Sequence, residues 1–127
     1  MEQIVGLDVS KAWLDGYAPA TGRRFRVSND PAGIEELLRS LTDPAGCLMV
    51  MEASGGYKRL VHRLLAERGM KAAVVNALRV RQFAKASGLL AKTDRLDAAV
   101  IARYGAFAKP APTLVRAGAR EQLAELL

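Results

Sequence analysis

The first thirty residues contain three short segments in which apolar residues dominate or alternate with polar ones. Residues 4–10 (IVGLDVS) are apolar except for Asp8 and the final serine, which is the pattern of a central strand buried on both faces. Residues 13–18 and 23–27 alternate between apolar and polar positions, and the turn-forming stretch PATG separates them. We therefore predict an antiparallel meander of three strands at the start of the chain.

The rest of the chain alternates between helical and strand-like patterns. Residues 30–41 place apolar side chains at the i, i+3, i+4, i+7 spacing of an amphipathic helix, and two short apolar runs further on are typical of buried strands. The elements predicted after the meander are a helix at 30–41, a strand at 47–51, a helix at 57–68, a strand at 71–75, a helix at 77–87, and a last helix from Thr93 or Asp94 to Lys109. This order predicts an α/β fold with a five-stranded mixed sheet flanked by helices, in which residues 4–10 form the central strand.

The composition changes after the stretch KPAP at residues 109–112. We expect one folded domain over residues 1–109, followed at 110–127 by a linker and the start of a helix or coiled coil that this chain does not complete. No apolar run approaches the ~20 residues that span a bilayer, and the first residues do not resemble a signal peptide. The single cysteine, Cys47, lies in an apolar run. These features predict a cytoplasmic protein.

The charge of the chain points to a polyanionic partner. Nineteen Lys and Arg against 13 Asp and Glu give a net charge of +6. Between Leu78 and Lys109, seven basic and two acidic residues contribute 7 − 2 = +5 of that total. We predict that this stretch binds nucleic-acid phosphates, although a solvated basic face without a partner is the alternative interpretation. The candidate contacts are Arg79, Arg81, Lys85, Lys92 and Arg95, together with Lys11 and Tyr57, which closely follow two of the acids discussed next.

Four acidic residues lie where apolar or helical patterns make them conspicuous. Asp8 interrupts an apolar strand, and Glu52 follows the apolar run 47–51. Asp94 and Asp97 are three residues apart, so on a helix they would share one face. Each acid alone has a structural explanation: an ion pair for Asp8 or Asp97, the glycine-rich turn for Glu52, a helix cap for Asp94.

Hard divalent cations account for the four acids as a group. Mg²⁺ takes oxygen ligands, and clustered carboxylates surrounded by basic residues suit a metal-dependent reaction at a phosphodiester. We therefore predict that Asp8, Glu52, Asp94 and Asp97 form a catalytic site that binds Mg²⁺, with Mn²⁺ as a substitute. The only histidine, His62, is expected to be a structural or surface residue, and no His/Cys cluster suggests zinc.

Three motifs resemble a known family: GLDVSK at 6–11, MEASGGY at 51–57 and KTDRLDA at 92–98. In order and spacing they are similar to the N-terminal RuvC-like domain, an RNase H-like fold, of transposases of the insertion-sequence-110 type and the related pilin-gene invertases. The resemblance implies a bacterial, nucleoid-associated DNA recombinase whose D-E-D-D tetrad falls on Asp8, Glu52, Asp94 and Asp97. It also implies a longer protein with a C-terminal domain, a guide RNA and assembly into homo-oligomers.

Two interpretations from other functional classes stay open at this point. GLDVSK also resembles the first phosphate loop of the actin and sugar-kinase type of nucleotide-binding domain, which ATP binding would support. A nucleic-acid-binding module without catalysis is the other alternative, and binding that needs no metal would support it.

Overall fold

The computed structural model describes residues 2–53, 56–89 and 96–115. A single five-stranded sheet has the order β3-β2-β1-β4-β5. In chain order the elements are β1 (Gln3–Val9), β2 (Trp13–Ala18), β3 (Arg23–Ser28), α1 (Pro31–Ser40), a 3-10 turn η1 (Pro44–Gly46), β4 (Cys47–Glu52), α2 (Lys58–Glu67), β5 (Lys71–Val75), α3 (Ala77–Ala86) and α4 (Ala98–Ala108).

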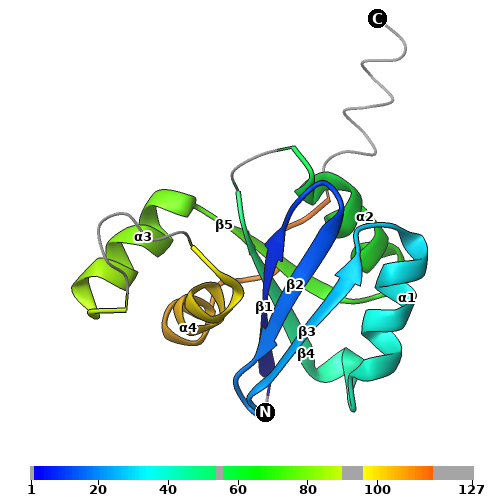
Figure 1. Cartoon of the computed structure of the whole chain (residues 1–127), viewed down its shortest axis with the longest axis horizontal. Helices are drawn as coiled ribbons and strands as arrows, with labels where there is room; N and C mark the ends of the chain where they lie inside the picture. The colour runs from blue at the N-terminus through cyan, green and yellow to red at the C-terminus, as the bar shows by residue number, and fades with distance from the viewer. Residues whose placement is uncertain (1, 54–55, 90–95, 116–127) are drawn as a thin grey trace, which may run out of the picture.

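The predicted mixed sheet is confirmed, and β1 is its central strand. β1 pairs antiparallel with β2 and parallel with β4, β2 pairs antiparallel with β3, and β4 pairs parallel with β5. The carboxyl ends of β1, β4 and β5 therefore lie at one edge of the sheet, which we call the carboxyl edge. Figure 1 shows the turn between β1 and β2 at this edge and the described N-terminus at the opposite one.

Helices cover the two faces of the sheet and create two hydrophobic cores. On one face, α1 and α2 pack on alternate strand residues that include Val5, Leu7, Met49 and Met51. On the other face, α3 and α4 pack on the intervening residues, including Leu48 and Val50. This alternation is the two-residue period of strand side chains, and it assigns every strand position to one face.

The start of the last helix differs from its prediction. Residues Leu96 and Asp97 are not helical, and α4 begins at Ala98. Asp97 has an extended backbone (φ −99°, ψ 175°), and its side chain accepts a hydrogen bond from the backbone N–H of Val100 at 2.9 Å. Asp97 is therefore the cap of the helix rather than a residue within it, because an aspartate at this position satisfies an N–H that the first turn leaves without a helical partner.

The segment after α4 returns to the edge of β5. The Thr113 N–H donates to the carbonyl of Ala72 at 2.8 Å, and the Val74 N–H donates to the Thr113 hydroxyl at 2.9 Å. His62 of α2 is 2.9 Å from the Thr113 carbonyl through Nε2, at a partly exposed position, which agrees with the expectation of a structural or surface residue. The predicted helix within residues 116–127 lies outside the described residues. In the part of the chain that is described, no helix has the length and apolar character needed to cross a membrane.

Candidate functional site

Asp8 and Glu52 lie side by side at the carboxyl edge. The parallel pairing of β1 and β4 runs in register from Gln3 and Cys47 to Leu7 and Met51, and Asp8 and Glu52 are the next residues on the two strands. Both continue the alternation that points Val50 toward α4, so both carboxylates belong to the α3–α4 face. Each is partly shielded from solvent. A buried pair of strands thus holds two acidic side chains next to each other.

Asp97 approaches the same edge through the packing of α4 on β1. A Cβ atom at Gly6 would collide with the Ala98 carbonyl and lie 2.6 Å from the backbone nitrogen of Ala102. The start of α4 therefore lies directly over Gly6, two residues before Asp8. Asp97 immediately precedes this contact, and one of its oxygens caps the helix.

Asp94 falls outside the described residues, and so the convergence of all four acids stays a prediction. In the ranges that the structure describes, no three Asp, Glu, His or Cys side chains form a group that could hold a metal ion. The chemistry of the donors nevertheless suits a hard cation, since Asp8 and Glu52 present adjacent carboxylates and hard cations prefer oxygen ligands. The described residues thus supply two neighbouring carboxylates, and Asp97 is a further acid at the start of α4.

The structure adds a fifth acid to this site that is not among the residues predicted from the sequence. Asp15 of β2 is the cross-strand partner of Asp8. Its carboxylate accepts two hydrogen bonds from Arg26 of β3, at 2.7 Å to Nε and 3.2 Å to Nη2. This carboxylate raises the pKa of the Arg26 guanidinium and is itself balanced by that charge. Only the register of β1, β2 and β3 places Asp15 opposite Asp8, and the sequence alone does not fix that register.

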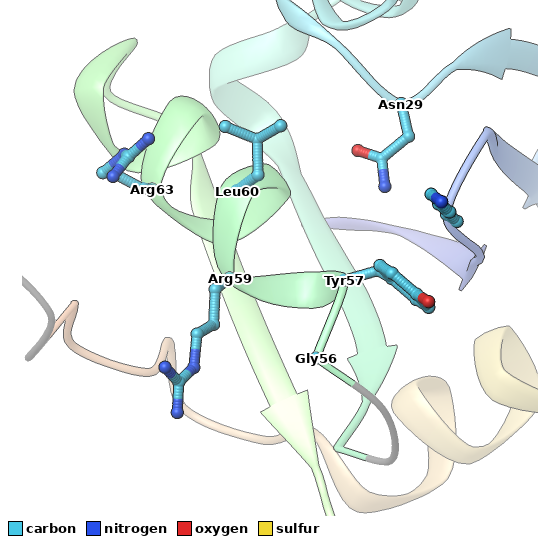
Figure 2. Close-up of a pocket in the computed structure, with 7 residues that line it drawn as sticks. Asn29, Gly56, Tyr57, Arg59, Leu60 and Arg63 are labelled. Atoms are coloured by element: carbon cyan, nitrogen blue, oxygen red, sulfur yellow. The ribbon is translucent and has the colours of Figure 1, made fainter.

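The predicted basic contacts divide into three groups. Arg79 and Arg81 belong to the first half of α3, which begins directly beyond the carboxyl end of β5, and Lys85 belongs to its last turn. Asn76 caps this helix, accepting from the N–H groups of Leu78 and Arg79 at 2.8 and 3.2 Å. Lys11 and Tyr57 line one common pocket, shown in Figure 2. Lys92 and Arg95 lie outside the described residues.

Comparisons with known proteins agree with the motifs. A family model described as "Transposase", for DEDD transposases of the insertion-sequence-110 type, matches residues 5–127. A pilin gene-inverting protein of Moraxella bovis is 30% identical over 113 residues, which cover 84% of this chain and 35% of that protein. Its counterpart in Moraxella lacunata is 29% identical over 113 residues, with the same coverage. The chain spans about a third of the length of these curated relatives.

The architecture and the family match lead to one assignment. The five-stranded mixed sheet flanked by helices is consistent with the RNase H-like fold expected from the motifs. The family model extends over almost the whole chain and includes all three motifs. This chain belongs to the DEDD transposase family of the insertion-sequence-110 type.

Proposed function

We propose that this chain is the carboxylate domain of a DNA transposase or site-specific recombinase, and that it supports divalent-metal-dependent cleavage and transfer of DNA strands. The observation that carries the proposal is the placement of Asp8 beside Glu52 on the face covered by α4. An α/β sheet collects functional groups at the carboxyl ends of its strands, and these acids lie at that edge. The family match supports a transposase over the nucleotide-binding alternative.

Asp8 and Glu52 are the residues that would hold Mg²⁺, or Mn²⁺ in its place, with Asp94 and Asp97 as further proposed ligands. When bound, such a cation stabilises charge on the attacking and leaving oxygens of a phosphodiester displacement. The chain's own contribution is positional. Backbone pairing of β1 with β4 holds two carboxylates adjacent, and the contact of α4 with Gly6 brings Asp97 toward them.

The basic residues of α3 are proposed to hold DNA beside the acids. Arg79 and Arg81 follow β5 at the same edge, and the net charge of +6 favours association with phosphates. Lys85, together with Lys92 and Arg95, is proposed to extend this contact. Binding through phosphates should weaken steeply with salt and depend little on sequence.

The relatives' length and name suggest further partners for a full-length protein. The relatives are about three times as long as this chain. We propose that a C-terminal domain, a guide RNA and assembly into homo-oligomers complete the reaction. These proposals rest on the family resemblance. The relatives are named for inverting a pilin gene, which supports DNA as the substrate.

Thermal unfolding with and without Mn²⁺ tests the metal site without requiring activity. A cation that binds only the native state stabilises it by mass action, by about 2.7 kcal/mol at a hundred times its dissociation constant. The melting temperature of the chain should therefore rise with Mn²⁺, and Asp8→Asn and Glu52→Gln should each abolish the rise. Glu36→Gln, which removes an exposed acid of α1, is the matched control and should keep it. An equal Mn²⁺ shift in Asp8→Asn and in the control would refute the proposed site.

A further inference from the structure

A basic pocket lies at the carboxyl edge, across the sheet from the acids. Its volume is about 320 Å³, near the lower end of the ~300–1,000 Å³ typical of small-molecule pockets. Its lining residues are Lys11, Asn29, Gly56, Tyr57, Arg59, Leu60 and Arg63, none of which is acidic. Lys11 comes from the turn between β1 and β2. The other lining residues come from the end of β3 and from α2 with the residues just before it, as Figure 2 shows.

The pocket combines positive charge with an aromatic surface. Within the described ranges, neither Lys11 nor Arg59 forms an ion pair, whereas Arg63 lies 4.0 Å from Glu67. Tyr57 is 51% exposed. It is the residue just before α2, and its side chain makes no capping hydrogen bond to the helix. In Figure 2, Tyr57, Leu60 and Asn29 surround the hollow, and Arg59 and Arg63 extend from the side of α2 that faces away from Asn29. Both arginines are part of the pocket lining.

Asn29 adds a polar atom that lacks a partner. Its Nδ2 donates to the Ser10 carbonyl at 2.8 Å, which fixes the orientation of the amide. The other atom, Oδ1, is buried and accepts no hydrogen bond from any described residue. Buried acceptors without a partner are uncommon, and Figure 2 shows this oxygen directed toward Leu60, another residue of the pocket lining. Because this oxygen has almost no solvent-accessible surface, a ligand donor, such as a sugar hydroxyl or a base N–H, would reach it only if the adjoining wall of the pocket moves.

Cations for phosphate, an aromatic ring for a base and an acceptor for an N–H or O–H are the complement of a nucleotide. We propose that this pocket binds one unpaired nucleotide of a nucleic-acid strand, with its base or sugar beside Tyr57 and Asn29 and its flanking phosphates at Lys11 and Arg59. Stacking on an aromatic side chain and phosphate contacts are the usual elements of single-strand binding.

The position of the pocket links it to the carboxylates. Lys11 lies three residues after Asp8, and Tyr57 lies five residues after Glu52, so both walls of the pocket continue from the strands that carry the acids. A nucleic-acid strand that crosses the carboxyl edge of the sheet would contact the pocket on one face of the sheet and the acids on the other face. This inference rests on the proposed function, and it assigns the pocket the task of anchoring the strand next to the acids.

Fluorescence anisotropy with labelled single strands of dT and rU tests the inference on the whole chain. The variant Lys11→Gln/Arg59→Gln should bind about tenfold more weakly, and its salt slope should fall by about 1.4, or 0.7 for each lost phosphate contact. Tyr57→Leu should also weaken binding about tenfold through lost stacking. The control is Arg24→Gln/Arg39→Gln, which removes the same charge at exposed positions near the start of β3 and in the last turn of α1, and it should change affinity less than about threefold. The strand that loses more affinity in the pocket variants identifies DNA or RNA as the source.

The possible results separate the inference from the function on which it rests. Failure of the unmodified chain to bind either strand at low salt would overturn both. Binding by the unmodified chain, with equal affinity in the pocket and control double variants, would overturn the nucleotide pocket and leave the proposed function standing. Melting curves check that each variant is folded. If the Lys11→Gln/Arg59→Gln variant does not fold, the affinity of Tyr57→Leu alone tests the nucleotide pocket.

Discussion

Ala102 of α4 packs directly on the bare backbone of Gly6 in β1. A Cβ atom at Gly6 would lie 2.6 Å from the Ala102 nitrogen and 2.9 Å from its Cβ, closer than such atoms approach in folded proteins. This contact lets the helix lie against the central strand and places the Asp97 end of α4 near Asp8. The glycine of the GLDVSK motif therefore has a structural role in assembling the acidic site.

Replacing Gly6 by alanine should destabilise the domain. The added methyl group meets backbone atoms of α4 that cannot move aside cheaply, and overpacking of this kind costs about 1–3 kcal/mol. Urea unfolding followed by circular dichroism measures the loss. Gly56→Ala is the control, because a Cβ there meets nothing within 4 Å and stability should change little. Equal stability of Gly6→Ala and the unmodified chain would show that α4 is not held by this contact.

Two substitutions at Asp97 separate its structural and chemical roles. Asparagine can still cap α4 through its side-chain oxygen, whereas alanine cannot, so Asp97→Ala should lose about 1 kcal/mol and Asp97→Asn little. If Asp97 is also a metal ligand, both variants should reduce the Mn²⁺-induced rise in melting temperature. Retention of the full rise in Asp97→Asn would limit this residue to capping.

The hydrogen bonds between Thr113 and β5 should protect the backbone amide of Val74 from hydrogen exchange. Thr113→Val keeps the shape of the side chain but removes the acceptor for the Val74 N–H, which should cost about 1 kcal/mol and accelerate hydrogen exchange at that amide. Thr113→Ser retains the hydroxyl and should behave like the unmodified chain. An unchanged rate of hydrogen exchange at Val74 in the valine variant would argue against the hydrogen bond between Val74 and Thr113 in solution.

The pH dependence of stability should contain a contribution from Asp30. Hydrogen bonds from the Gly33 N–H and the Ser28 hydroxyl lower the pKa of this carboxyl below its usual 3.8. A lowered folded-state pKa means that the stabilisation is present above the unfolded pKa and is lost as the pH falls through the folded value. Urea midpoints between pH 5 and pH 2.5 should fall more steeply for the unmodified chain than for Asp30→Asn. Parallel curves would show that the cap has no ionic component.

Local patterns were sufficient to predict the five strands and the central position of β1. They were insufficient where tertiary packing decides. Phe107 has the spacing of a core residue, yet it is 71% exposed, and its ring contacts Phe83 of α3 instead of the sheet core. The buried residues of α4 are Ala98, Val100, Ile101, Ala102 and Gly105. The predicted start of α4 at Thr93 or Asp94 is wrong because the sequence does not distinguish an aspartate within the first turn of a helix from one at its cap, and Asp97 is the cap.

The site shows the same division between local and long-range information. Asp8 and Glu52 stand out as acids at apolar strands, and parallel order predicts that their strand ends meet. The pairing of Asp15 with Arg26 and the grouping of Asn29 with Arg59 depend on strand register and helix placement. Neither leaves a signal in the local sequence, and so both emerged only from the structure.

If Asp8 and Glu52 share a divalent cation, a crystal of the chain soaked in Mn²⁺ should contain the metal between them. Anomalous difference density identifies the metal independently of any activity. We expect a peak in contact with the carboxylates of both residues, and its loss in crystals of Asp8→Asn. Soaked crystals whose anomalous map is empty at these two carboxylates, or whose peaks lie only elsewhere on the surface, would contradict it.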